Sequence, residues 1–132
     1  RDANLPGKSL LRLADAPPED RVAFSEFHTY GPDAFYMLRT LRHKYVHYVG
    51  APPQLFDLDS DPEETNDLGT ANSAADLRNG LEARLRALLD PEAADRDAKA
   101  DQAAMIDLYG GEAVLRTKAP AAFTPPPRAG GH

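Results

Sequence analysis

The pattern of apolar and polar residues predicts a run of β-strands in the first half of the chain. Residues 21–28 alternate with period two, so that Val22, Phe24 and Glu26 project to one side and the residues between them to the other. Comparable segments follow, and we expect strands at residues 21–28, 34–40, 44–49 and 55–58. Because the connections between these segments are short, neighbouring strands are expected to pair in antiparallel fashion.

The spacing of leucines predicts a helix after the strands. This helix begins at Ser73, with Asp76 three residues later in the chain. Its leucines recur at helical spacing: Leu77, Leu81, Leu85, Leu88 and Leu89. Arg78, Glu82 and Arg86 are expected on the outer side of the helix. Burying five leucines against the sheet contributes on the order of 10 kcal/mol, so we expect truncation before Ser73 to unfold the chain.

A second helix with a thinner apolar stripe is predicted over residues 91–109. It begins at Asp90-Pro91 and stops at Gly110-Gly111, residue types that suit the two ends of a helix. The prolines and glycines of residues 111–132 predict an extended tail that lies on another domain or subunit. The expected fold is therefore α+β: a four-stranded antiparallel sheet covered by one amphipathic helix, with a second helix and an extended C-terminal tail.

Size and composition fit one small domain with tails. The 132 residues are 42% hydrophobic and 27% charged, which is usual for a globular protein. We expect a linker from a preceding domain over residues 1–20, the folded domain over 21–110 and the tail over 111–132. The net charge of −6 argues against a nucleic-acid-binding module. Since no apolar run has membrane-spanning length, we expect no membrane partner either.

A local basic cluster interrupts this acidic chain at the tip of the second predicted hairpin. It consists of Arg39, Arg42, His43 and Lys44. Lysine and arginine at the edge of a sheet are more often solvated than bound to an anion. A solvated edge is therefore the favoured interpretation, and an anion site is the alternative.

The segment from Gln54 to Leu68 predicts a strand that ends in a capped turn. Residues 55–58 supply the apolar strand. The following Asp61-Pro62-Glu63-Glu64 has the residue types of a helix start. Its aspartate suits the N-cap, its proline suits the first helical position, and the carboxylate of Glu64 can reach back to the cap.

This segment and the strands before it resemble the C-terminal region of sulfatases of the alkaline phosphatase superfamily. The resemblance rests on elements that occur in the same order: Met37-Leu-Arg39, Leu41-Arg-His43, Lys44-Tyr45 and Leu55 to Leu68. It is tightest over residues 21–68. Further similarities lie outside that range: Gly7-Lys-Ser-Leu-Leu11 is similar to the end of the family's catalytic domain, and Asp90-Pro-Glu-Ala93, Lys99-Ala-Asp-Gln102 and Thr124-Pro-Pro-Pro127 are similar to the tails of bacterial members.

The resemblance implies a parent enzyme whose catalytic groups lie elsewhere. Such sulfatases use a formylglycine made from the first residue of a Cys/Ser-x-Pro-x-Arg motif, together with a calcium ion. This chain has no cysteine, and none of its prolines completes that motif. It also begins at Arg1 without an apolar leader, so we expect a piece of a longer bacterial enzyme that is inactive by itself. The implied partners are an upstream catalytic domain, a small-molecule sulfate ester and, through the tail, another copy of the protein.

Glu26 and His28 are the candidates for facing the substrate. They lie two residues apart at the end of the first predicted strand, so they can project together from one edge of the sheet. In the family that the chain resembles, the corresponding strand end lies near the mouth of the active-site cleft. An ordinary structural role is nevertheless favoured by the residues alone: Glu26 pairs with a sheet cation such as Arg39, and His28 caps a turn.

Metal binding is the weaker interpretation of two other groups. His43 and His47 lie on one face of the third predicted strand, but no further ligands converge on them. Asp57, Asp59 and Asp61 alternate like the oxygen ligands of a calcium loop. A proline follows where further ligands should come, so capping and turn roles are favoured. We therefore predict no metal ligand in this chain.

Two other functions stay open. Cleavage of phosphonate or phosphate monoesters by a related enzyme of the superfamily is compatible with the same residues in this region. A free-standing binding or assembly module, without a catalytic parent, is the alternative from another class. A formylglycine motif encoded upstream of Arg1 would exclude the module. The composition favours neither cytoplasmic nor periplasmic residence.

Overall fold

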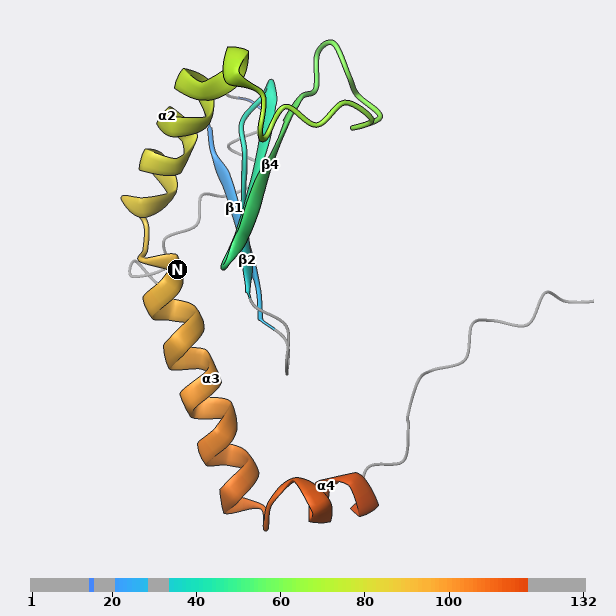
Figure 1. Ribbon diagram of the computed structural model, residues 1–132, viewed down its shortest axis with the longest axis vertical. Coiled ribbons are helices and arrows are strands. Elements are labelled where there is room, and N and C mark those ends of the chain that lie inside the picture. The colour runs from blue at the N-terminus through green and yellow to red at the C-terminus, as the bar shows by residue number, and fades with distance from the viewer. Residues whose placement is uncertain (1–14, 16–20, 29–33, 119–132) are drawn as a thin grey trace, which may run out of the picture. The chain divides into compact units, whose positions relative to one another are not determined.

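The computed structural model describes residue 15, residues 21–28 and residues 34–118. The chain divides into two compact units, Arg1–Pro91 and Glu92–His132. The elements of the first unit are β1 (Ala23–Phe27), β2 (Phe35–Arg39), β3 (His43–Tyr48), β4 (Ala51–Asp57), the 3-10 turn η1 (Asn72–Ala74) and α2 (Ala75–Arg86). The second unit holds most of α3 (Pro91–Leu108) and all of α4 (Glu112–Lys118) (Figure 1).

The four strands form one antiparallel sheet in chain order, β1-β2-β3-β4. The register places Phe24 opposite Leu38, Leu38 opposite Tyr45, and Tyr45 opposite Leu55. Residues directly opposite each other project to the same face, so this row runs across one face of the sheet. The predicted meander and the α+β class are therefore confirmed.

The last strand begins earlier than the sequence predicts. β4 starts at Ala51 rather than Leu55 and includes two prolines. The turn before it is confined to Val49 and Gly50, and the φ of Gly50 is 75°, a conformation that glycine adopts without strain. Prolines are tolerated in β4 because it is an edge strand, where a missing N–H need not break the hydrogen-bond ladder.

The segment after β4 is a turn capped by Asp61, but no helix begins there. The Asp61 carboxylate accepts hydrogen bonds from the backbone N–H groups of Thr65 and Asn66, at 3.0 and 2.9 Å. Glu64 has a φ of 56°, in the left-handed region, and accepts a hydrogen bond from the Lys44 ammonium. The predicted capped turn is thus confirmed. The helix-start role of Glu64 is wrong, because the ammonium group is a stronger partner than a cap N–H.

The core of the first unit lies between α2 and the face of the sheet that carries Tyr45. Leu38, Tyr45 and Leu55 from the sheet are buried, as are Leu81 and Leu85 from α2. Figure 1 shows α2 beside the sheet, with the helix connected to β4 through the long segment after that strand. The prediction that this helix covers the sheet is confirmed.

The start of α2 and its leucine stripe differ from the prediction. Ser73 lies in η1, and α2 follows Ala74 without a side-chain cap. Leu88 is 60% exposed, whereas Leu77 and Leu89 are half-buried. The helix ends before Leu88, so the stripe buries less apolar area than an uninterrupted helix would, and the predicted 10 kcal/mol is too large.

The second unit begins with the predicted second helix and then departs from the prediction. α3 is followed by Gly110 and Gly111, with φ of 96° and 88°, as expected at a helix end. α4 over Glu112–Lys118 contradicts an extended tail that starts at residue 111. Its Glu-Ala-Val-Leu-Arg run contains good helix formers and an acidic first turn. Residues 119–132 lie outside the described residues. Within the described chain, no helix combines the length and apolar character needed to cross a membrane.

Candidate functional site

Glu26 and His28 come together at the edge of the sheet, as their spacing predicts. Glu26 lies in β1, an edge strand, and His28 directly follows that strand. The Nε2 atom of His28 lies 3.8 Å from Oε2 of Glu26, whose side chain is 52% exposed. The Nδ1 atom of His28 is buried and has no hydrogen-bond partner in the part of the chain that the structure describes. The pair therefore offers an accessible carboxylate beside an imidazole.

The predicted pairing of Glu26 with Arg39 is wrong. The register places Glu26 opposite Tyr36, near one end of β1, and Arg39 near the other end of the strand pair. His28 lies edge-on to the Tyr36 ring, with ring centroids 5.5 Å apart and ring planes at 81°. The turn over residues 29–33, which His28 is predicted to cap, lies outside the described residues.

A row of polar rings continues from His28 to α2. The rings of Tyr36 and His47 lie 6.4 Å apart. The Nδ1 atom of His47 lies 3.1 Å from a carboxylate oxygen of Glu82 on α2. The same carboxylate oxygen accepts a hydrogen bond from the Tyr45 hydroxyl at 2.7 Å. These contacts connect the histidine at the edge strand to the helix that covers the sheet.

Glu82 is the residue of this row that the sequence pattern misplaces. Helical spacing predicts it on the outer side of the helix, whereas its side chain is only 24% exposed and is hydrogen-bonded to the sheet. The sequence feature that could have predicted the position of Glu82 lies in β3. Tyr45 and His47 share the covered face of the sheet, and their polar atoms need a hydrogen-bond partner there. Arg78, also predicted outside, is half-buried and donates to the Gly69 carbonyl at 3.0 Å.

Electrostatics in this row favour an ionised Glu82 and a neutral Tyr45. Burial and then the hydrogen bond to the Glu82 carboxylate raise the pKa of Tyr45. Burial also raises the pKa of Glu82, but the hydrogen bond from Tyr45 and the charge of His47 outweigh it, so the pKa lies below the ordinary value. The carboxylate is therefore a fixed acceptor at neutral pH.

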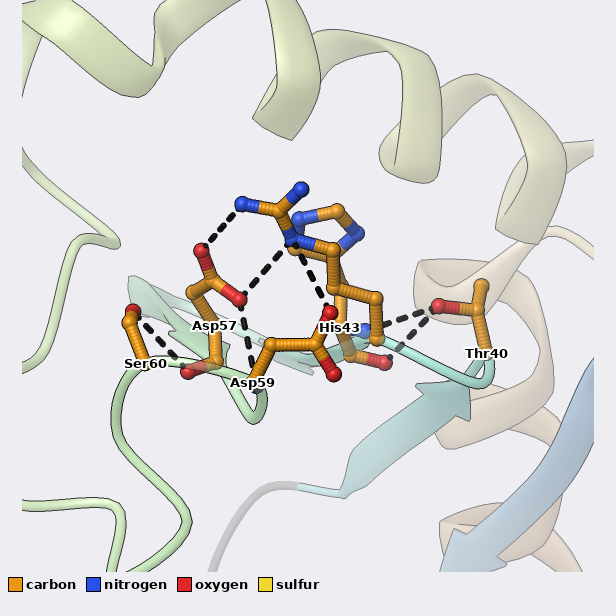
Figure 2. Close-up of polar contacts among 6 residues, drawn as sticks. Thr40, His43, Asp57, Asp59 and Ser60 are labelled. Carbon is orange, nitrogen blue, oxygen red and sulfur yellow. Dashed lines mark hydrogen bonds and ion pairs between the residues drawn. The ribbon is translucent and has the colours of Figure 1, made fainter.

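The aspartates of the candidate calcium loop serve as turn and ion-pair residues. Asp57 accepts two hydrogen bonds from the Arg42 guanidinium, from Nε at 3.0 Å and from Nη2 at 2.7 Å. Asp59 lies 3.8 Å from the same Nε atom, and Figure 2 shows both carboxylates around this guanidinium. The hydrogen bond from Arg42 holds the pKa of Asp57 well below its usual range. The predicted turn role is confirmed for Asp57, which accepts a hydrogen bond from the Asp59 backbone N–H at 3.3 Å, and for Asp61, whereas Asp59 contributes an ion pair.

The histidines of β3 do not form a common site. His47 contacts Glu82, whereas His43 lies opposite Asp57 in the strand register. The backbone N–H of His43 donates to the Thr40 hydroxyl at 2.8 Å, within the β2–β3 hairpin (Figure 2). Over residues 21–28 and 34–118, no group of three or more His, Cys, Asp or Glu side chains is placed to hold a metal ion.

Comparisons with known proteins find sulfatases. Arylsulfatase K of Gallus gallus is 46% identical over 74 residues, which cover 46% of this chain and 14% of that protein. Arylsulfatase K of Mus musculus is 35% identical over 100 residues, which cover 66% of this chain and 18% of that protein. A solved structure of a candidate sulfatase from Bacteroides thetaiotaomicron has a TM-score of 0.57 and 26% identity, over 65% of this chain and 20% of that one. No family model matches the chain.

The matched region is only a small part of each sulfatase. The chain spans less than a fifth of the length of the curated relatives that it matches. In the other direction, the mouse protein and the bacterial structure each match about two thirds of this chain. The similarity to sulfatases agrees with the resemblance found in the sequence motifs. The chain is a segment homologous to part of the sulfatases.

Proposed function

We propose that the chain is the C-terminal, non-catalytic subdomain of a longer sulfatase that hydrolyses sulfate esters, and that it helps to wall the active-site cleft. The observation that carries the proposal is the Glu26–His28 pair, 3.8 Å apart on an edge strand of a segment homologous to part of the sulfatases. A carboxylate accepts hydrogen bonds, and an imidazole can donate or accept. The pair is therefore suited to the hydroxyl-bearing, non-reacting part of a substrate.

Catalysis is assigned to an upstream domain of the same protein. A formylglycine nucleophile and a calcium ion, the groups that the resemblance implies, would be held by residues of that domain. The residues of this chain fit neither group, because the sequence has no cysteine and no Ser-x-Pro-x-Arg motif. The described residues also lack a cluster of metal-binding side chains. No reaction step is assigned to this chain.

An aromatic row on the other face of the sheet supports docking on that catalytic domain. Phe27 stacks on Phe35 with ring centroids 5.0 Å apart, and Phe35 lies 5.6 Å from the Tyr48 ring. Phe27 is 50% exposed, and the other two rings are half-buried. Partly exposed aromatic side chains that lie next to one another are suited to an interaction surface. Because the chain spans less than a fifth of its curated relatives, the occupant proposed for this row is the remainder of the same protein.

Substitutions in the full-length enzyme test the recognition role. Glu26→Ala and His28→Ala are each expected to raise KM for a sulfate ester roughly tenfold, the effect of losing a hydrogen bond to a charged or polar partner. The kcat is expected to change by less than about twofold, because the lost contact is equally strong in the ground and transition states. His43→Ala on β3 is the matched control and should leave both constants unchanged. A fall in kcat with unchanged KM would contradict recognition by this pair.

A further inference from the structure

The basic cluster of the β2–β3 hairpin is only partly neutralised. The Arg42 guanidinium donates to Asp57, and the Lys44 ammonium donates to Glu64. Arg39 lies opposite Lys44 in the strand register. Its side chain has no ion pair or hydrogen bond within the described residues. Among the residues that the structure describes, Arg39 therefore has no carboxylate partner.

A second arginine, which has no acidic partner among the described residues, lies beside Arg39. Arg21 lies two residues before Ala23, and Ala23 is opposite Arg39, so alternation places both arginines on one side of the strand pair. Both line the same pocket, of about 320 Å³, together with the apolar side chains of Val22 and Leu41. Both arginines are exposed. None of the described residues that line this pocket is acidic.

We propose that Arg21 and Arg39 bind a compact organic oxyanion, a sulfate monoester or a carboxylate, whose uncharged body lies against Val22 and Leu41. The planar guanidinium group donates two parallel hydrogen bonds and matches the oxygen spacing of either anion. The pocket volume is at the lower end of the range for small-molecule sites. This site uses neither Glu26 nor His28 and is independent of the proposed function.

Charge balance distinguishes this pair from an ordinary solvated edge. Like charges that lie close together repel each other, yet these two arginines line one pocket with no carboxylate among its described lining residues. The neighbouring cations Arg42 and Lys44 both have carboxylate partners. The chain as a whole carries a net charge of −6, so the positive charge around Arg21 and Arg39 is opposite in sign to the charge of the whole chain. A bound anion relieves the repulsion that the described residues leave uncompensated.

The test is a ligand titration of the 132-residue chain. Binding is monitored by NMR through the arginine Nε–H signals and the nearby backbone amide signals. Phenyl sulfate and benzoate serve as the two anionic probes, and benzamide serves as the uncharged control. We expect saturable shifts at Arg21 and Arg39 with at least one anion, weaker binding as salt is raised, and no binding of benzamide. Tighter binding of phenyl sulfate identifies a sulfate site, and tighter binding of benzoate identifies a carboxylate site.

Variants separate a built site from general electrostatic attraction. Arg21→Gln and Arg39→Gln should each raise Kd at least about tenfold. Arg39→Lys should raise Kd less, because lysine keeps the positive charge although it lacks the paired N–H donors of the guanidinium group. Arg96→Gln on α3 removes the same charge elsewhere and should leave Kd unchanged. Thermal unfolding should match the parent chain for every variant, since the substituted side chains are exposed. Equal weakening by Arg96→Gln, or no saturable shift with either anion, would overturn the proposal.

Discussion

The Nδ1 atom of His47 on β3 lies 3.1 Å from the carboxylate of Glu82 on α2. The same carboxylate accepts hydrogen bonds from the Tyr45 hydroxyl and from the Nε–H group of Arg86. One side chain thus joins two residues of the sheet to the helix that covers it. A partly buried charge with this many partners stabilises the packing only while its partners are present, so each contact can be tested separately.

Removing the Tyr45 hydroxyl tests the contribution of this contact to stability. Tyr45 is 2% exposed and donates at 2.7 Å to an ionised carboxylate, so Tyr45→Phe should lower the free energy of unfolding by about 1–2 kcal/mol. Urea denaturation of the 132-residue chain measures the change. Tyr109→Phe is the matched control, because that ring is 58% exposed, and it should unfold like the parent. Equal midpoints for the two variants would show that the hydroxyl contributes nothing.

The lowered pKa of Glu82 predicts an acid-sensitive contribution to stability. A carboxyl group whose pKa is lowered in the folded state stabilises the fold fully above its ordinary pKa of 4.5 and loses that contribution as the pH falls through the lower native value. In Glu82→Gln this part of the pH dependence is absent. Melting temperatures between pH 7 and pH 3 should therefore fall less steeply for Glu82→Gln than for the parent chain.

A control glutamate isolates this effect from the other acids of the chain. Glu63 is exposed, so Glu63→Gln should keep the parent's dependence on pH. Identical slopes for Glu82→Gln and Glu63→Gln would contradict the role given to the Tyr45–Glu82–His47 contact.

Substitution by alanine is expected to have opposite effects on stability at Gly69 and at Gly80. A Cβ atom on Gly69 would lie 2.0 Å from the Pro53 carbonyl oxygen and 2.8 Å from the Cα of Gln54, both backbone atoms. Gly69→Ala should therefore lower the free energy of unfolding by about 2 kcal/mol. Gly80 lies in α2 with nothing within 4 Å of the added atom, so Gly80→Ala should raise it by roughly 0.5–1 kcal/mol. Chemical denaturation of both variants compares them directly, and a destabilised Gly80→Ala would contradict the open helix surface.

The strands could be predicted from the sequence because their pattern is local. Period-two alternation and short connections define β1 to β3 without knowledge of what packs on them. The start of β4 could not be predicted in this way, because Pro52 and Pro53 normally indicate a turn and are compatible with a strand only at a sheet edge. α4 was obscured by Gly110-Gly111 and by the prolines farther on, although its own residues favour a helix.

The candidate site divides in the same way between local and long-range contacts. The approach of His28 to Glu26 follows from their spacing on one strand. The position of Glu82 does not, because it depends on the side of α2 that meets the sheet, and Leu81 and Leu85 determine that side through burial. The predicted Glu26–Arg39 pair does not form, because the strand register places the two residues apart, and the register cannot be read from one strand alone.

Hydrolysis of a chromogenic aryl sulfate tests the central claim most directly. The measurement compares the full-length protein with the 132-residue chain under the same conditions. We expect turnover by the full-length protein and none by the chain alone, because the nucleophile and the metal site are assigned to the upstream domain. Turnover by the isolated chain, or a full-length protein that binds but never cleaves sulfate esters, would contradict the assignment.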